Sequence, residues 1–316
     1  MEDTIRVGVS SCLLGNKVRY DGGHKHDYYI TDALSRYFSF VPVCPEVECG
    51  LPVPREAMRL VGNIENPRLI TIKTGIDLTE KMLRYSAARV KELENDDIDA
   101  FIFKKNSPSS GLYRVKIYDQ SGRVHGKGQG LFARSLVEQF PYLPVEEEGR
   151  LQDMSLRENF IERIFSYKRW KNFLIDSPDF RKLITFHAHH KLQLMAHSPK
   201  HLSKIGKLVA EGKNIPVQIL FKQYGENLME AMSLKATVKK NVNVLHHIIG
   251  YFKKHIGSDD KKELLKLIDQ YHNGYSPLVV PLTLINHYIR KHRIIYLSDQ
   301  TYLEPHPSEL MLRNHV

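Results

Sequence analysis

The stretch FIFKKNSPSSGLYRVKIY, residues 101–118, decides how the first part of this chain folds. Residues 98–104 are apolar enough for a buried strand, and residues 113–119 alternate as in a strand with one buried face. Between the two strands lies a short polar loop with two adjacent serines, Ser109 and Ser110, before a glycine. Such a loop is either a plain turn or the edge of a site.

The rest of residues 1–140 alternates strand and helix patterns. Strands are predicted at 5–10, 40–44 and 68–72, and helices at 30–38, 77–95 and 128–140. This alternation predicts an α/β three-layer domain with a mostly parallel sheet. In such sheets ligands bind beyond the carboxyl ends of the strands, where the loops that follow them meet.

The periodicity changes after residues 141–153, which contain two prolines and an acidic run and are typical of a linker. From there on, apolar residues recur three and four positions apart, which predicts an all-α domain of about six or seven helices. We therefore predict two domains, at residues 1–145 and 150–316.

Composition indicates a globular protein with a sizeable core. The chain has 316 residues, of which 42% are hydrophobic and 26% charged. No run approaches the roughly 20 apolar residues of a membrane helix, and the acidic N-terminal residues do not form a secretory signal. We expect a cytoplasmic protein without a membrane partner, and no obligate protein partner is evident. Three cysteines, an odd number, argue against a disulfide framework.

The positive charge is concentrated in the second half. Residues 1–148 hold 20 Lys and Arg against 21 Asp and Glu, which leaves 26 against 15 for residues 149–316. The second half thus carries a net charge of +11 and 13 of the 16 histidines. This asymmetry predicts a polyanion-binding domain beside a near-neutral one.

Three loops of the first domain contain the residues that could bind a metal or take part in a reaction. They span residues 10–25, 44–56 and 104–112, and each follows a predicted strand. Cys12, Cys44 and Cys49 lie in them, but the gap between Cys44 and Cys49 is wider than a usual zinc spacing. The residues alone leave a metal site and plain packing cysteines both open.

The amino-acid sequences of these loops resemble those of a known family. The strings SSCLLGNKVRYDGGHK (10–25), CPEVECGLPVPR (44–55) and NSPSSGLYRVKIY (106–118) are similar to the bacterial thiouracil desulfurase family. FHAHHKLQLMAHSP (186–199) resembles the YbgA-type domain that is often fused to it. The fused form is similar to tRNA 4-thiouridine desulfidases, and the resemblance covers essentially the whole chain.

The resemblance implies a 4Fe-4S cluster with three protein ligands and one open iron, and hydrolytic, non-redox removal of sulfur as sulfide. Cys12 and Cys44 match two cluster ligands, Glu46 matches the catalytic carboxylate, and Ser107 matches an assisting serine. Iron bound by soft thiolates readily takes sulfur as a further ligand, which suits a thiolated base as substrate.

One position departs from the family pattern. Ser110 stands where the family has its third cysteine ligand. A serine oxygen is a harder and less acidic donor than a thiolate, so the cluster should be held more weakly. Ligation by Ser110, substitution by Cys49, and a weakened or absent cluster all stay open.

The second domain contains candidate RNA contacts. Lys and Arg contact phosphates, and Trp or His stack on exposed bases. The candidates lie in YKRWKN (167–172) and in the histidine-rich segment at 187–197; they are Lys168, Arg169, Trp170, His187, His190 and Lys191. A partly buried polar face is the alternative for each histidine, and the metal-binding HExxH pattern is missing from this segment.

The combined hypothesis is a desulfidase that acts on a thiolated nucleobase, namely 4-thiouridine in tRNA. Two alternatives remain at this point. The chain could be a non-catalytic RNA-binding protein with a degenerate cluster site, because Ser110 replaces a cysteine. It could also be a desulfurase of free thiouracil, which would leave the basic domain without a clear role.

Overall fold

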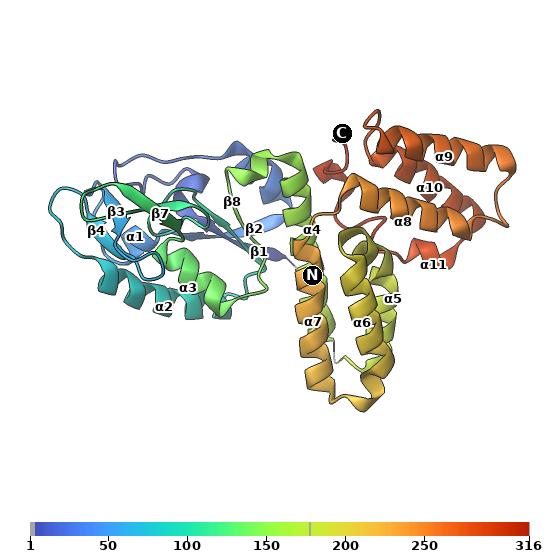
Figure 1. The fold of residues 1–316 in the computed structure, drawn as a ribbon, viewed down its shortest axis with the longest axis horizontal. Coiled ribbons are helices and arrows are strands. Elements are labelled where there is room, and N and C mark those ends of the chain that lie inside the picture. The colour runs from blue at the N-terminus through green and yellow to red at the C-terminus, as the bar shows by residue number, and fades with distance from the viewer. Residues whose placement is uncertain (1–3, 177, 316) are drawn as a thin grey trace. The chain divides into compact units, whose positions relative to one another are not determined.

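The computed structural model describes residues 4–176 and 178–315 (Figure 1). The chain divides into two compact units, Met1–Gln152 and Asp153–Val316. The first is an α/β unit and the second consists mostly of helices, which confirms the predicted fold classes. None of the helices in the described part of the chain is long and apolar enough to cross a membrane.

The first unit is built on a four-stranded parallel sheet with the strand order β2-β1-β5-β8. Its strands are β1 (Ile5–Ser10), β2 (Phe38–Val43), β5 (Ala100–Phe103) and β8 (Val145–Glu147). The central strands β1 and β5 are buried almost throughout, as their apolar runs predict. Because β1 lies between β2 and β5, the segments that follow these three strands leave the same edge of the sheet.

Two of the predicted strands belong to a second, mixed sheet with the order β4-β3-β6-β7. It consists of β3 (Met58–Val61), β4 (Arg68–Thr71), β6 (Val115–Tyr118) and β7 (Val124–Gly128). A tight turn joins β6 to β7, because Gly122 adopts a φ of 82° and its N–H donates to Asp119 O. The sequence prediction missed this hairpin and its last strand.

Three α-helices complete the described part of the first unit, namely α1 (Pro45–Glu48), α2 (Thr79–Asn95) and α3 (Leu131–Gln139). Helix α2 begins two residues after the start that the sequence predicts, and the Asp77 carboxylate before it accepts hydrogen bonds from Thr79 and from the Arg68 guanidinium. Apolar residues of α2 and α3 form one core with β3, β4 and β6. The helices therefore fix the second sheet beside the loops of the first.

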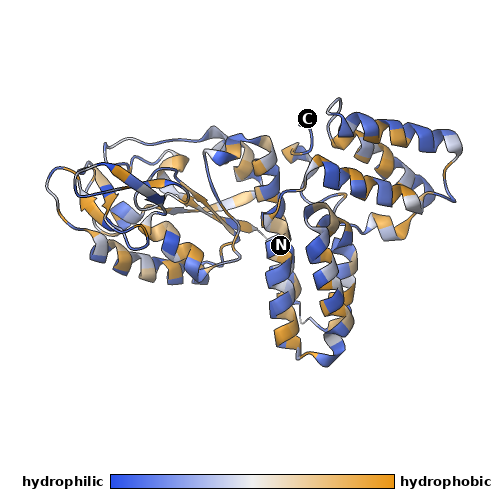
Figure 2. Cartoon of the chain, viewed as in Figure 1, coloured by the Kyte–Doolittle hydropathy of each residue, from blue (hydrophilic) through white to orange (hydrophobic). Residues whose placement is uncertain are grey.

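The second unit contains seven long helices and one short one within residues 153–176 and 178–315. Figure 2 shows hydrophobic and hydrophilic residues interleaved along them, as the three- and four-residue spacing predicts. The helices are α4 (Met154–Ile175), α5 (Phe180–His197), α6 (Pro199–Glu211), α7 (Val217–Ser233), α8 (Val238–Tyr251), α9 (Ser258–His272), α10 (Val279–His292) and α11 (Ile295–Ser298).

A buried charged cluster holds the C-terminal segment against α4 and α5. The Arg313 guanidinium lies 3.4 Å from Glu158 Oε1 and 3.9 Å from Glu162 Oε1, and it donates to Tyr302 O at 2.6 Å. His197 Nε2 lies 3.3 Å from Glu162 Oε2. Burial raises the pKa of Glu158 to about 7, whereas His197 and Arg313 outweigh the effect of burial on Glu162 and lower its pKa.

Candidate active site

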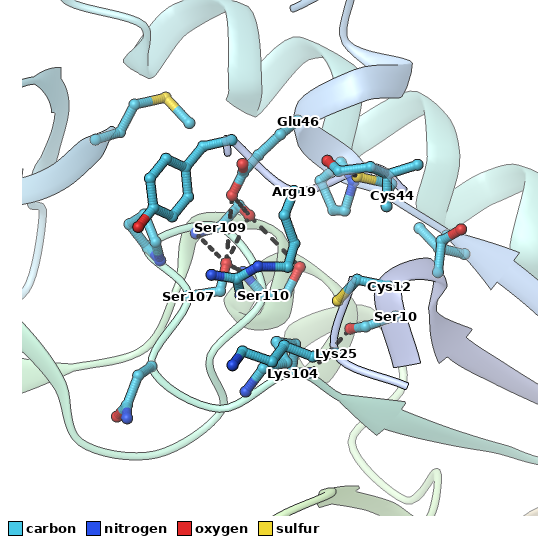
Figure 3. Close-up of a pocket in the computed structure, with 18 of the residues that line it drawn as sticks. Ser10, Cys12, Arg19, Lys25, Cys44, Glu46, Lys104, Ser107, Ser109 and Ser110 are labelled. Atoms are coloured by element: carbon cyan, nitrogen blue, oxygen red, sulfur yellow. Dashed lines mark hydrogen bonds between the residues drawn. The ribbon is translucent and has the colours of Figure 1, made fainter. Parts of the chain in front are cut away.

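The three predicted loops meet at the carboxyl ends of β1, β2 and β5 (Figure 3). They line a cavity of about 420 Å³, a size usual for small-molecule sites. Ser10 ties two of the loops together, because its hydroxyl accepts a hydrogen bond from Lys104 N at 2.9 Å. Cys12, Cys44, Glu46, Ser107 and Ser110 all lie on the wall of this cavity.

Cys12 is held by a 3-10 turn, Ser11–Leu14, that directly follows β1. Gly15 ends the turn with a φ of 89°, and Cys12 O accepts the N–H groups of Gly15 and Lys25. Burial raises the pKa of the Cys12 thiol to about 11, against the opposing effect of Lys104. The thiol therefore stays protonated at neutral pH unless a metal ion displaces the proton.

Cys44 caps the start of α1, where β2 turns into the helix. Its backbone N–H donates to Glu48 Oε1, and burial raises the pKa of its thiol. Cys49 lies at the other end of α1 and packs against the core of the second sheet, with its thiol directed at Glu46 O at 3.2 Å. Cys49 does not line the cavity, so the structure does not bring it together with Cys12 and Cys44.

The loop after β5 is held in one conformation by close backbone packing. A Cβ on Gly130 would lie 2.4 Å from Ser109 O, and a Cβ on Gly111 would lie 2.7 Å from Ser107 O. Ser107 Oγ accepts the N–H groups of Ser109 and Ser110, at 3.3 and 3.1 Å. Ser110 is only 4% exposed, and its hydroxyl has a single weak contact, Ser109 Oγ at 3.5 Å.

Glu46 is the centre of the hydrogen-bond network in this cavity. Its Oε2 accepts two hydrogen bonds from the Arg55 guanidinium, which is anchored in turn on Val18 O. Its Oε1 accepts from Ser109 Oγ at 2.8 Å and from Ser107 Oγ at 3.4 Å. One carboxylate oxygen is thus paired with a cation, while the other faces hydroxyl groups on the cavity wall (Figure 3).

Both serines that contact Glu46 should contribute to stability. Ser107→Ala leaves two loop N–H groups without their acceptor, so we expect it to lower the free energy of unfolding of the first unit by about 1–3 kcal/mol. Ser109→Ala removes the buried hydroxyl that donates to the Glu46 carboxylate at 2.8 Å, and a hydrogen bond to a charged group is worth about 1.5–3 kcal/mol. Calorimetric unfolding of both variants measures these losses, and a loss below about 0.5 kcal/mol in either variant would contradict the prediction.

The donor set fits the implied cluster at two of three positions. Cys12 and Cys44 offer thiols from neighbouring loops, and the third position presents the buried hydroxyl of Ser110. Within residues 4–176 and 178–315, no group of three His, Cys, Asp or Glu side chains is placed to hold a metal ion. The cavity thus offers two thiols, and a hydroxyl at the third position of the family pattern.

Sequence reasoning missed the closest partners of Glu46. Arg55 belongs to the quoted string CPEVECGLPVPR, but no spacing rule connects it to a carboxylate nine residues earlier. The sequence predicts Ser107 as the serine near the catalytic carboxylate, but the hydroxyl of Ser109 lies nearer to Glu46. The one hint in the sequence that a cation would lie near Glu46 was the basic character of the three loops. Of their basic residues, the cavity is also lined by Arg19, Lys25, Lys104 and Lys105.

Three of the residues predicted to contact RNA have buried side chains in the second unit. Trp170 is buried, stacked on Tyr224 with ring centroids 5.0 Å apart, and packed against Gly225. His187 and His190 are buried too, and His190 Nδ1 lies 2.7 Å from Phe186 O. These buried rings are not accessible to a base from solvent, since the helices that carry them pack against neighbouring helices of the unit.

The three remaining candidates differ from one another. The Arg169 guanidinium is directed inward to Pro305 O, and burial lowers its pKa to about 10, so it does not reach phosphates either. Lys168 is partly buried, and Lys191 is exposed. Of the six residues, Lys191 has the accessibility that a phosphate contact needs.

The buried histidines should make the second unit sensitive to acid. Burial lowers the pKa of His187 to about 4 and that of His190 to about 3. As pH falls from 6.5 towards 4, these histidines become protonated in the unfolded chain but stay neutral in the folded chain. The free energy of unfolding therefore falls by up to about 1.4 kcal/mol per pH unit for each histidine.

Urea unfolding followed by the fluorescence of Trp170, the only tryptophan of the chain, measures this slope. We expect His187→Gln to flatten the pH dependence, whereas His272→Gln, at an exposed position on α9, leaves it unchanged. A slope that is the same in all three proteins would contradict the assignment.

Both halves of the chain match known families. Residues 7–148 match the family model described as 2-thiouracil desulfurase. Residues 191–307 match a family described as a protein of unknown function, DUF1722.

Two uncharacterized proteins are among the curated relatives of this chain. The uncharacterized protein YbgA of Escherichia coli (strain K12) is 35% identical over 135 residues, which is 42% of this chain and 79% of the relative. The uncharacterized protein YbbK of Bacillus subtilis (strain 168) is 30% identical over 147 residues, which is 44% of this chain and 93% of the relative.

Among solved structures, the 4Fe-4S-dependent thiouracil desulfidase TudS is 31% identical, and the match covers 49% of this chain and 97% of that chain, with a TM-score of 0.40. The resemblance seen in the sequence is confirmed by the two family matches. The chain therefore belongs to the 2-thiouracil desulfurase family, with its desulfurase domain in residues 7–148 followed by a YbgA-type domain.

Proposed function

We propose that this chain is a desulfidase that hydrolyses the C=S bond of a thiolated pyrimidine base, with 4-thiouridine in tRNA as the substrate. The observation that carries the proposal is the carboxylate of Glu46, which is held by Arg55 and Ser109 on the wall of a 420 Å³ cavity shared with two thiols. The family match and the net charge of +11 on residues 149–316 support the substrate class.

The side chains divide the work of hydrolysis between them. Water adds to the thiocarbonyl carbon, sulfur leaves as sulfide, and no electrons are exchanged overall. Glu46 accepts the proton of the attacking water, because its Oε1 faces the cavity while Arg55 keeps the carboxylate in place. Ser109 and Ser107 hydrogen-bond to the same oxygen, so they orient it and can pass on a proton.

The cofactor implied by the family would be held by Cys12 and Cys44, with Ser110 at the third position. A bound 4Fe-4S cluster supplies an iron that takes the departing sulfur. The buried Ser110 hydroxyl has no strong hydrogen bond to give up, so it is free to approach such a cluster as an oxygen donor.

Anaerobic reconstitution followed by iron and sulfide analysis tests the cofactor. We expect the wild-type chain to take up iron and sulfide, and Ser110→Cys to retain more of both, since a thiolate holds iron better than a hydroxyl does. Cys12→Ala and Cys44→Ala should lose them, while Cys49→Ala should not, because Cys49 lies outside the cavity. Uptake in Ser110→Cys but none in the wild type would overturn the enzymatic proposal and favour a degenerate, RNA-binding protein.

A comparison of substrates tests the tRNA assignment separately. Sulfide released from 4-thiouridine-containing tRNA is measured against sulfide released from free thiouracil under the same conditions. Preference for tRNA supports the proposal. Release from the free base alone would overturn it in favour of a thiouracil desulfurase.

A further inference from the structure

Two long stretches of the helical unit contain no acidic residue at all. Residues 231–258, which include α8, and residues 270–298, which include α10 and α11, have neither Asp nor Glu. Near the ends of these helices the two stretches present exposed cations, namely Lys253, Lys254, Arg290, Lys291 and Arg293. Most protein surfaces mix both signs of charge. A region in which cations outnumber the neighbouring acids, here Asp260 beside Tyr288 and Asp299 at the end of α11, attracts a polyanion.

Ring contacts bring these two stretches together. Tyr251 at the end of α8 stacks on Tyr296 of α11, with centroids 5.0 Å apart and ring planes 21° apart. His255 lies 5.7 Å from His292, the last residue of α10. We call the surface formed by residues 251–255 and 290–296 the α8–α11 surface; its helices lie in the orange to red part of Figure 1.

The centre of the α8–α11 surface is aromatic and apolar. Tyr251 is 36% exposed, and Ile295, which precedes Tyr296 in the chain, is 74% exposed. A stacked tyrosine pair with an accessible side can receive a nucleobase, because every base has a flat π-face. An aromatic centre with cations around it matches unpaired RNA, in which bases are splayed from a charged backbone.

Arg293 occupies a backbone position that favours glycine. It ends α10 with φ 52° and ψ 50°, and its N–H donates to Ile289 O. This left-handed conformation is strained for a residue with a Cβ, and helices usually place glycine there. The attraction of cations to a helix C-terminus does not explain the choice, since Arg290, Lys291 and His292 already supply charge in the last turn. A strained residue kept at the surface points to a role for its side chain.

We propose that the α8–α11 surface binds single-stranded RNA, with a base stacked on the Tyr251–Tyr296 pair and phosphates paired with Arg293 and Lys254. The inference deepens the proposed function and rests on it for the identity of the RNA as substrate. It also replaces the contacts predicted at Trp170 and the buried histidines. The residues that bind RNA are those at the helix ends, where two acid-free segments meet.

Fluorescence anisotropy with a labelled, unmodified single-stranded RNA of about 12 nucleotides tests the surface. We expect Tyr251→Ala to weaken binding about tenfold or more, because the stacking platform is lost. Arg293→Gly should weaken binding several-fold and reduce the slope of log K against log salt by about 0.7. Its melting temperature should be equal or higher, since glycine relieves the strained conformation. Weaker binding together with undiminished stability distinguishes a lost contact from a damaged fold.

Matched variants of the same unit serve as controls. Tyr275→Ala removes an 82% exposed tyrosine before the opposite end of α10, about 20 Å away, and Lys204→Gln removes an exposed charge on α6. Both should bind RNA as the wild type does. Unchanged binding by Tyr251→Ala and Arg293→Gly would overturn the proposal, and so would binding to anionic lipid vesicles without binding to RNA.

Failure of this proposal can be told apart from failure of the proposed function. The RNA probe contains no thiolated base and the cavity residues are untouched in every variant. Sulfide release from thiolated substrates by the unaltered protein is measured separately. Absence of sulfide with RNA binding that depends on Tyr251 would overturn the enzymatic proposal alone, whereas sulfide release with RNA binding that ignores Tyr251 would overturn the surface alone.

Discussion

Glu46→Gln should lower the rate of sulfide release by roughly 10²- to 10⁴-fold, the range over which a positioned general base contributes. Glutamine keeps the shape of the side chain and can still accept from Ser109, but its neutral amide does not take a proton from water. Arg55 would lose the anion that it contacts, although its anchor on Val18 O remains. The loss should therefore appear in the rate rather than in the structure.

The rate is measured as sulfide released by reconstituted protein, with iron content determined on the same sample. Iron content should match that of the wild type, because Glu46 is not one of the expected ligands. Glu80→Gln is the matched control, since this exposed carboxylate on α2 pairs only with Arg84 among the ion pairs found in the described residues. A Glu46→Gln protein that retained more than about a tenth of the activity would exclude Glu46 as the base.

Arg313→Met should destabilise the second unit by about 3–5 kcal/mol, the usual cost of breaking a buried ion pair on one side. The variant leaves Glu158 and Glu162 in the interior without the cation that they share, and Tyr302 O loses its donor. Methionine fills a similar volume, so the loss reflects charge rather than a cavity. Protonation of Glu158, whose pKa is already raised to about 7, should reduce the loss in mild acid.

Urea unfolding monitored by Trp170 reports this effect, because the single tryptophan lies in the core of the second unit. Arg181→Met removes an exposed arginine on α5 and should change stability by less than about 0.5 kcal/mol. A loss in Arg313→Met as small as that of the control would show that the buried cluster contributes little to stability.

Several elements of the cavity followed from the sequence alone. Apolar runs at 5–10 and 98–104 predicted buried parallel strands, and parallel strands place their following loops at one edge. Cys12, Cys44 and Ser110 come directly after such strands, so their meeting in one cavity could be predicted. The linker composition and the change to helical periodicity likewise predicted an α/β part followed by helices.

The contacts inside the cavity depended on long-range packing. Arg55 reaches Glu46 across a loop, and Ser109 reaches it from the loop after β5, 63 residues away. Such pairs follow from how loops fold over one another, and no local periodicity encodes them. The second sheet was missed for the same reason, because β3 pairs with β6 across more than fifty residues of chain.

The sequence by itself determined the two fold classes, the three loops and the chemical types that they carry, because short-range periodicity and parallel-strand geometry dictate these features. Only the tertiary structure decided which polar residues of the helices face solvent. Helix α5 packs against α6, α7 and α8, so His187, His190 and His197 are buried although their spacing is that of an amphipathic surface. Tyr251 and Tyr296 are 45 residues apart and meet because α8 and α11 are brought together by the core between them. Whether a residue is buried depends on the residues packed around it, and the fold determines which residues these are.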